Sequence, residues 1–362
     1  MTPDLPGGSL LAGLRREVDR NVYRTQNGIR YLTGGEWARI DPTPSDIVFE
    51  QGKVKLRHYH RDAPARFGPP VLAFLGLVSR SYILDLRRGN SFVQRLIDAG
   101  FDTFVLDWGE PDETDAHNTL ETYVQGYMSR AVDAMLEETG SSEINVIGYC
   151  MGGNLALLAL ASQPDGPWRN LVTMATPVDF RKGGPLVEAL RDGRIDVDSL
   201  IDETGNVPGS VVEHFFRIRH PTARAVRYAN LWENLWNDDY MESFQAMGRW
   251  VNEQIPIAGV AARQLIESWV RENAFYNDSL RLGGRRISLA DIHTPAFCVV
   301  ADRDEIVPRP MAMPIIERLA GTSPDVLHVD AGHTSLTTGR IAGNVTIPNV
   351  TEWLSAHSEE LT

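Results

Sequence analysis

The stretch EINVIGYCMGGNLALLALA, residues 143–161, decides the fold. It begins with an apolar run typical of a buried strand and ends with a helical pattern, and the segment Gly148-Tyr149-Cys150-Met151-Gly152-Gly153 joins the two. Gly148 and Gly152 stand where larger side chains would collide with the strand or the helix of a sharp turn. Such a turn lifts its central residue out of the sheet edge. We therefore interpret Cys150 as a nucleophile presented by a strand-turn-helix elbow.

The predicted helix that follows Cys150 adds to this interpretation. The first N–H groups of a helix point toward the residue that precedes it, and this end favours a thiolate by about 0.3–1 kcal/mol. The N–H of Met151 is then free to stabilise an oxyanion. A G-x-C-x-G string also occurs by chance, and the alternative is a structural thiol buried at a tight turn.

Short apolar runs of the same kind lie on both sides of the elbow. Most are separated by helical patterns such as SFVQRLIDAG, and this alternation predicts a mostly parallel sheet flanked by helices on both faces. With the elbow it predicts an α/β-hydrolase fold, whose core comprises residues 46–180 and 291–362. The runs are PPVLAFLGLV (69–78), FDTFVLDW (101–108), NLVTMAT (170–176), PAFCVVAD (295–302) and DVLHVDAG (325–332).

Two segments fall outside this alternation. Residues 181–290 contain no convincing buried strand and carry several tryptophans in helical patterns, so we expect a helical cap inserted over the site, or alternatively a structural subdomain with no gating role. Residues 1–45 carry Leu10, Leu14, Val18 and Tyr23 at helical spacing. We expect a helical arm packed on the core; the alternative is a surface for a partner or an apolar particle.

A cysteine nucleophile needs a base, and the base needs an orienting acid. In this fold the chain order is nucleophile, acid, histidine. His333 follows the run DVLHV in a loop that Gly332 opens, and we predict that it is the general base. Two aspartates compete for the acid. We favour Asp304, which precedes an Ile-Val-Pro turn, over Asp302, which we expect to hold the loop.

Composition excludes several classes of function. The chain has 362 residues and a formal net charge of -13, which disfavours binding to nucleic acid. The remaining histidines lack the spacing of a metal site, so we expect no metal. Of the two cysteines, Cys298 lies in an apolar run and is interpreted as a core residue. We find neither a secretory signal nor a transmembrane run, and we expect a cytoplasmic protein.

Several blocks of the chain, taken together, resemble one known family. The chain resembles the catalytic subunit of poly(3-hydroxyalkanoate) synthases, and its length resembles that of the class III form. The matching blocks run in the family order across most of the chain. They are SRSYILDLRRGNSFVQRLIDAGFDTFVLDWGEPD (79–112), GYCMGGNLALL (148–158), TMATPVDF (173–180), RWVNEQIPIAGVAARQLIESWVREN (249–273), DRDEIVP (302–308) and AGHT (331–334).

The resemblance implies a mechanism and partners. Cys150 would carry the growing acyl chain as a thioester, His333 would deprotonate the thiol and the incoming 3-hydroxyl, and Asp304 would orient His333. The oxyanion donors would be the N–H groups of Met151 and of a residue near Val78. The substrate would be an (R)-3-hydroxyacyl-coenzyme A, with no separate cofactor. An accessory synthase subunit or a homodimer, and association with polyester granules, are expected by the same resemblance.

Three positions depart from the family pattern. Ser79 stands where the family usually has Asn, Glu305 where it usually has His, and Thr334 where Ile or Val is common. Two other functions therefore remain alternatives: a cysteine hydrolase or thioesterase that lets water resolve the thioester, and a non-catalytic, granule-associated protein that kept the fold.

Overall fold

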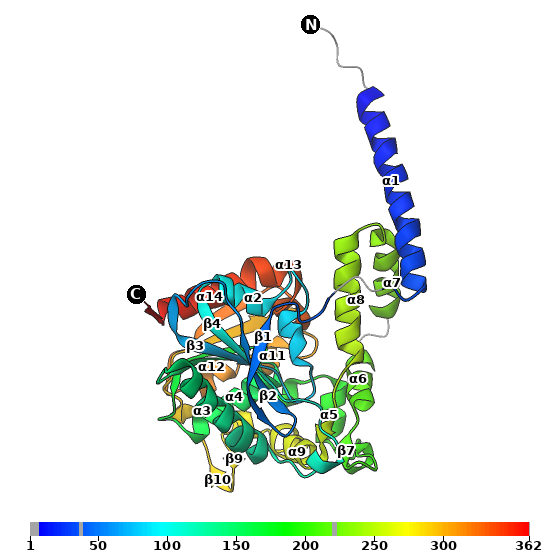
Figure 1. Ribbon diagram of the computed structural model, residues 1–362. Coiled ribbons are helices and arrows are strands. Elements are labelled where there is room, and N and C mark those ends of the chain that lie inside the picture. The colour runs from blue at the N-terminus through cyan, green and yellow to red at the C-terminus, as the bar shows by residue number, and fades with distance from the viewer. Residues whose placement is uncertain (1–6, 36–38, 219–222, 362) are drawn as a thin grey trace.

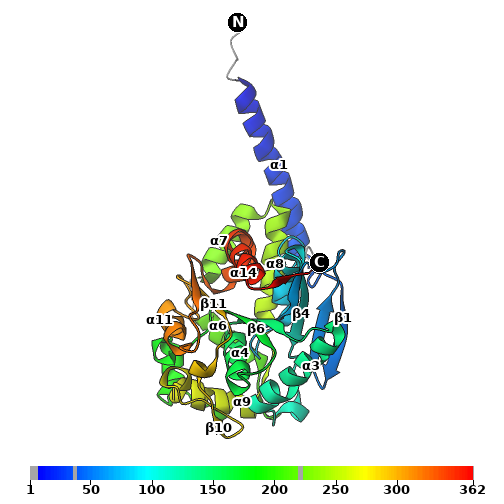
Figure 2. The same ribbon diagram turned by 90° about the vertical axis from the view of Figure 1, so that its left-hand side faces the viewer.

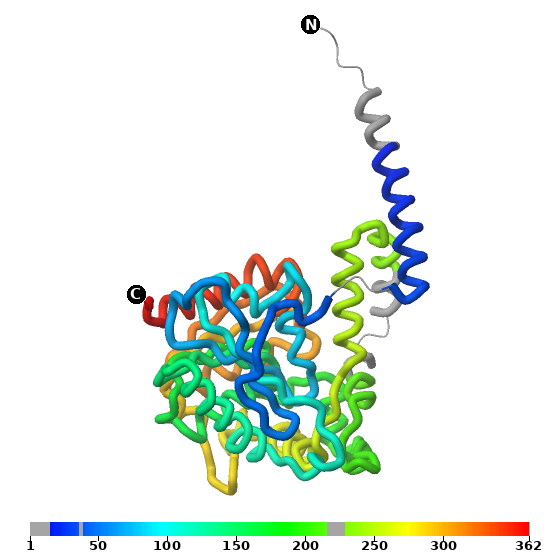
Figure 3. The backbone as a smooth tube through the Cα atoms, viewed as in Figure 1, coloured from blue at the N-terminus to red at the C-terminus, as the bar shows by residue number. Residues whose placement is uncertain are grey.

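The computed structural model describes residues 7–35, 39–218 and 223–361, and it describes side chains for residues 15–35, 39–215 and 229–361 (Figures 1 and 3). One long mixed sheet lies at the centre of the molecule, helices cover its two faces, and a group of helices stands to one side of it (Figure 1).

The central sheet has the order β1-β2-β4-β3-β5-β6-β11-β12, with the short β13 pairing with β3. The pairings among β4, β3, β5, β6, β11 and β12 are all parallel, whereas β1, β2 and β13 pair antiparallel. This confirms the predicted α/β-hydrolase fold with a mostly parallel sheet. The strands are β1 (Ser45–Gln51), β2 (Val54–Tyr59), β3 (Phe67–Phe74), β4 (Phe101–Asp107), β5 (Ile144–Tyr149), β6 (Trp168–Met174), β11 (Ala296–Ala301), β12 (Asp325–Val329) and β13 (Glu359–Glu360).

Helices bury their apolar sides against both faces of the sheet. On one face lie α2 (Phe92–Asp98) and α14 (Ile347–Ala356), whose buried side chains join one apolar cluster with alternate residues of the strands. On the other face lie α3 (Ser129–Thr139) and α4 (Met151–Ser162), which join a second, larger cluster. Because both faces are covered, the central strands are continuous apolar runs, as the sequence predicted.

The segment between β6 and β11 is mostly helical. Its helices are α5 (Pro185–Arg191), α6 (Gly209–Ile218), α7 (Ala223–Asn234), α8 (Asp238–Asn252), α9 (Gly259–Gln264), a π-helix (Leu265–Arg271) and α10 (Ala274–Asn277). The sequence showed no convincing buried strand here, yet the structure has a short buried pair, β7 (Asn206–Val207) with β8 (Ile257–Ala258), and a mostly exposed pair, β9 (Arg281–Leu282) with β10 (Arg285–Arg286). These pairs are two residues long, too short for an apolar pattern to mark them.

The two ends of this insertion differ in how they pack. Residues after β8 enter the main core: Trp269 and Phe275 are buried there with their rings 5.2 Å apart. Helices α7 and α8 instead stand beside the sheet and share a small separate cluster of Leu231, Leu235 and Met241 (Figure 1). Residues of the earlier half, such as Val197 and Val207, also lie in the main core, so the prediction that the insertion forms a cap over the site remains a prediction.

The N-terminal arm is the 26-residue helix α1 (Gly7–Leu32), and it points away from the body of the molecule (Figures 1 and 2). The prediction that it packs on the core was wrong: Val18 is 61% exposed and Tyr23 52%. Its attachment is to α7 and α8 near its C-terminal end, where the Asn27 amide donates to the Leu235 carbonyl and the Asp238 carboxylate, each at 2.8 Å. Leu10 and Leu14 lie outside the residues whose side chains are described.

Candidate active site

The elbow around Cys150 has the geometry that its glycines predict. β5 ends at Tyr149, α4 begins at Met151, and Cys150 between them adopts φ 56° and ψ -125°. A positive φ is strained for a residue with a side chain and is typical of a nucleophile elbow. A Cβ on Gly148 would lie 2.7 Å from the Gly152 carbonyl oxygen, and one on Gly152 would lie 2.5 Å from that of Phe74. Both positions therefore require glycine.

His333 and Asp304 lie together beside the elbow. His333 opens a short 3₁₀ turn after β12, and its Nδ1 lies 2.6 Å from Oδ2 of Asp304. The other carboxylate oxygen of Asp304 accepts hydrogen bonds from the N–H groups of Ile306 and Val307, both at 2.8 Å. With Nδ1 engaged by the acid, the other ring nitrogen is left to act on Cys150, which is close enough to influence the pKa of His333.

The electrostatics of His333 reflect these two partners. Burial by itself would lower the pKa of the imidazole, but the charge of Cys150 and the hydrogen bonds with Asp304 and Cys150 outweigh burial and raise the pKa to about 10. An imidazole that keeps its proton at neutral pH stabilises a thiolate beside it. The surroundings of His333 therefore favour its protonated form, which can stabilise negative charge developing on the neighbouring sulfur.

The two candidate acids have different surroundings. The Asp304 side chain is fully buried, whereas Asp302 is partly exposed and lies 3.1 Å from His328 and 3.4 Å from Arg309. Asp302 thus joins the end of β11 to strand β12 and to the start of α11 (Arg309–Ala312), and it makes no bond to His333. The structure brings Cys150, His333 and Asp304 together, and it places Asp302 outside this group.

The two expected oxyanion donors occupy different surroundings. Met151 is the first residue of α4, so its N–H has no acceptor within the helix. Val78 lies in the loop after β3, and its carbonyl accepts a hydrogen bond from the N–H of Ile255 at 3.2 Å. A Cβ on Gly76 of the same loop would lie 2.5 Å from Cβ of Met151, so this loop passes directly over the start of α4.

The loop after β3 is bonded to the residues that follow α8. Beside the bond from Ile255 to Val78, the Trp250 indole donates to the Arg80 carbonyl at 3.2 Å. The Arg80 guanidinium donates to the Glu253 carbonyl at 3.2 Å, and the Tyr82 hydroxyl donates to the Glu253 carboxylate at 2.9 Å. We call these four hydrogen bonds the cap clasp. No local pattern predicts the cap clasp, because the residues that it joins are about 170 positions apart.

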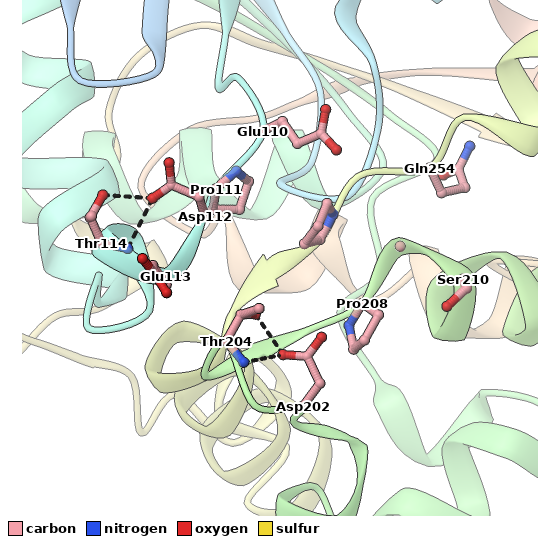
Figure 4. A pocket seen from close by; sticks show the side chains of 12 residues that line it. Glu110, Pro111, Asp112, Glu113, Thr114, Asp202, Thr204, Pro208, Ser210 and Gln254 are labelled. Carbon is pink, nitrogen blue, oxygen red and sulfur yellow. Dashed lines mark hydrogen bonds between the residues drawn. The ribbon is translucent and has the colours of Figure 1, made fainter.

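A cavity of about 620 Å³ opens beside the cap clasp (Figure 4). Its lining includes Gln254 and Pro256 from the residues after α8, together with the carboxylates of Glu110, Asp112 and Asp202. Two of these carboxylates are already engaged by threonine side chains, as the dashed lines in Figure 4 show. A cavity with this charge repels phosphate groups. We therefore do not assign it to coenzyme A.

In the described part of the chain, no group of three His, Cys, Asp or Glu side chains is placed to hold a metal ion. Nor does any described helix combine the length and apolar character needed to cross a bilayer. The chemistry that the described residues support is nucleophilic, with Cys150 as the attacking atom.

Comparison with known proteins gives two results. A family model described as "alpha/beta hydrolase fold" matches residues 69–339. A poly(3-hydroxyalkanoate) polymerase subunit PhaC of Allochromatium vinosum is 32% identical over 333 residues, which cover 91% of this chain and 93% of that protein. The corresponding subunit of Thiocystis violacea is 30% identical, over 95% of this chain and 97% of its own. This chain belongs to the poly(3-hydroxyalkanoate) polymerase family.

Other polymerase subunits of the family are longer. The subunit of Haloferax mediterranei is 30% identical over 88% of this chain, but the match spans only 65% of that protein. Among solved structures, an esterase from Thermogutta terrifontis superposes with a TM-score of 0.52 over 88% of this chain and 99% of its own, at 17% identity. This likeness supports the fold alone.

The three departures from the polymerase pattern lie around the site without replacing an atom of it. Ser79 is partly buried in the loop after β3, Glu305 is exposed, and Thr334 follows His333 in the 3₁₀ turn. The Thr334 carbonyl accepts a hydrogen bond from the Thr338 hydroxyl at 2.8 Å, so this residue helps to close the turn that carries the base.

Proposed function

We propose that this chain polymerises (R)-3-hydroxyacyl-coenzyme A through a thioester on Cys150, with release of coenzyme A. The observation that carries the proposal is the meeting of Cys150 with the buried His333–Asp304 pair, in a chain that belongs to the polymerase family. No cofactor beyond the coenzyme A of the substrate is needed for this chemistry.

The first half-reaction loads the enzyme. The Cys150 thiolate attacks the thioester carbonyl of the substrate, and the N–H of Met151 and an N–H of the loop near Val78 stabilise the oxyanion. The C–S bond to coenzyme A then breaks, and the proton held by His333 goes to the departing thiolate. Exchange of one thioester for another is nearly isoenergetic, so the acyl group stays ready for transfer.

The second half-reaction extends the polymer. Neutral His333 takes the proton from the 3-hydroxyl of the next hydroxyacyl group, and the resulting alkoxide attacks the thioester on Cys150. An ester bond forms as the bond to Cys150 breaks. Water competes for the same thioester, so a covered site favours growth over hydrolysis. Tryptophan-bearing helices such as α8 and its clasp are the candidates for this cover.

The exposed arm is the surface that we assign to an accessory subunit or a second copy of the chain. Val18, Val22 and Ile29 lie on one side of α1 at intervals of four and seven residues, and all three are exposed. A helix with an exposed apolar stripe buries it against a partner when one is present. The relatives are named as subunits, which accords with such an assembly, and we propose association with polyester granules on the same basis.

One incubation separates the candidate functions. The purified chain is mixed with 3-hydroxybutyryl-coenzyme A, released coenzyme A is measured, and the acyl product is identified. Polymer is the expected product. Free hydroxyacid would instead identify a thioesterase, the second candidate that the shared fold and cysteine nucleophile allow. No release of coenzyme A, with or without a partner subunit, would contradict both enzymatic functions.

A further inference from the structure

Tyr149, the residue before the nucleophile, bonds to the backbone of the base. Its side chain is buried, and its hydroxyl donates a hydrogen bond to the main-chain carbonyl of His333 at 3.1 Å. Its ring lies 4.9 Å from the imidazole, tilted by 35°. The last residue of β5 is thus connected to the loop that carries His333.

This contact complements the one made by Asp304. Asp304 fixes the direction of the ring through Nδ1, but a hydrogen bond to one ring nitrogen leaves the distance of the backbone from Cys150 unset. Tyr149 is covalently joined to Cys150 and bonded to the carbonyl of His333. A displacement of the 3₁₀ turn would therefore break the Tyr149 bond before His333 could leave the thiol.

The position of the loop that carries His333 explains why an additional contact such as the Tyr149 hydrogen bond is needed. His333 sits after β12, the last strand at one edge of the sheet, whereas Cys150 sits on β5 in the middle, with β6 and β11 between them. Small shifts of an edge strand would therefore change the Cys150–His333 distance. Misplacement of reacting groups by about 1 Å costs as much as 10²-fold in rate.

We propose that Tyr149 is a positioning residue that sets the distance between His333 and Cys150 through its hydrogen bond to the His333 carbonyl. It acts on the reaction through His333 and does not touch the substrate. The inference rests on the proposed function only for its effect on turnover, because its effect on the thiol exists without substrate.

The test is Tyr149→Phe, which removes one oxygen atom and keeps the ring. Iodoacetamide alkylation of Cys150 is followed by intact mass from pH 5 to 10, with no substrate present. We expect alkylation at pH 7 to slow by about tenfold and its half-maximal pH to move upward, because His333 no longer supports the thiolate. In turnover with 3-hydroxybutyryl-coenzyme A, kcat falls by a similar factor and KM is unchanged.

Tyr59→Phe is the matched control. Tyr59 is also buried, and its hydroxyl donates to Oδ1 of Asp41 at 3.3 Å, on β2 and away from the site. The control is expected to alkylate and turn over as wild type does. Wild-type alkylation and kcat in Tyr149→Phe would overturn the proposal.

A second variant and a second comparison separate failure of this proposal from misfolding and from failure of the proposed function. If Tyr149→Phe does not fold, Tyr149→Leu also removes the hydroxyl bonded to the His333 carbonyl, and wild-type alkylation in that variant overturns the proposal as well. Slowed alkylation in Tyr149→Phe, in a wild-type chain that makes no polymer, supports the role of Tyr149 and contradicts the proposed function alone.

Discussion

The triad and the cap are built in opposite ways, although they lie next to each other. Asp304 and His333 are buried, and each is fixed by several hydrogen bonds to neighbouring loops. Helices α7 and α8 share a small apolar cluster, and the C-terminal half of α8 also buries Ala246 and Trp250 in the apolar cluster that contains α2 and α14. They join the body through the cap clasp and through Arg87, which lies 2.8 Å from Asp239 and 3.0 Å from the Ser243 hydroxyl.

This difference shows which part of the molecule can move at low cost. Moving the triad would break buried apolar packing and charged hydrogen bonds, whereas α7 and the first half of α8 could shift at the cost of a small apolar cluster and a few polar contacts. A site that must admit a long acyl chain and exclude water needs both properties. The reacting groups stay fixed, and the cover is the part held by replaceable bonds.

Among changes to the triad, loss of the nucleophile is expected to have the largest effect on turnover. Cys150→Ala abolishes turnover and the covalent acyl adduct, with the fold retained, as measured by intact mass after exposure to substrate. Cys298→Ala leaves activity nearly unchanged and costs about 1–2 kcal/mol of unfolding free energy, because Cys298 is a buried core thiol on β11. An acyl adduct that persists on Cys150→Ala would contradict the assignment of Cys150 as the nucleophile.

Asp304 and Asp302 are only two positions apart in the chain, yet their replacement is expected to have different effects. Asp304→Asn loses the carboxylate that orients His333, so kcat falls by roughly 10³–10⁴-fold. Asp302→Asn weakens only the partly exposed contacts with His328 and Arg309, so its effect is confined to stability. Steady-state kinetics and thermal unfolding of both variants decide this. A reversed order of the two rate losses means that Asp302 is the acid.

The cap clasp is where the two regions meet, and a smaller effect is expected there. Tyr82→Phe removes the hydrogen bond to Glu253, worth about 0.5–1.5 kcal/mol, without opening a cavity. Hydrogen exchange in residues 238–256 is expected to accelerate, and the ratio of hydrolysed to polymerised product to rise about twofold to tenfold. Unchanged exchange there, with an unchanged product ratio, would mean that the clasp does not hold the cover.

The protonation of His333 in the triad can also be tested through the pH dependence of the free energy of unfolding. The folded-state pKa of His333 is raised from 6.5 to about 10 by Cys150 and Asp304, against the effect of burial. A raised pKa stabilises the folded state fully below pH 6.5, and this contribution is lost as pH rises toward 10. In urea unfolding at several pH values, the stability advantage of wild type over His333→Gln is expected to shrink across that window. An advantage that grows with pH would mean that His333 is neutral in the resting enzyme.

The arm gives the smallest effect on the chain alone. Val22→Ser lies on the exposed side of α1, so activity and unfolding temperature of the isolated chain stay within error of wild type. Association, measured by sedimentation with the partner subunit or with a second copy, is expected to weaken. Unchanged association in a Val18, Val22 and Ile29 triple serine variant would remove α1 from the interface.

The features that could be predicted from the sequence are those that depend on residues close together in the chain. Glycines at two fixed places and apolar runs on both sides gave the elbow, and the order of Cys150, Asp304 and His333 along the chain gave the candidate triad. These signals are local because a strand, a turn and a helix start each depend on neighbouring residues. The same logic gave the parallel sheet.

The unpredicted part depends on contacts between distant segments. Tyr149 reads in the sequence as one more apolar strand residue, and its bond to His333 spans 184 positions. The arm was misplaced because an amphipathic pattern says that one side of a helix is apolar without saying what covers it. The tryptophans of the insertion were equally ambiguous: Trp269 is a core residue, whereas Trp232 is 67% exposed.

The attachment of α1 also limits how a distant binding event reaches the thiol. A 26-residue helix is about 39 Å long, so a molecule held at its free end is far from Cys150. Within the described residues, the hydrogen bonds and ring contacts of α1 go to α7 and α8, and α8 leads directly into Trp250 and Glu253 of the clasp. The described contacts therefore connect the arm to the loop that carries Val78 by way of α8.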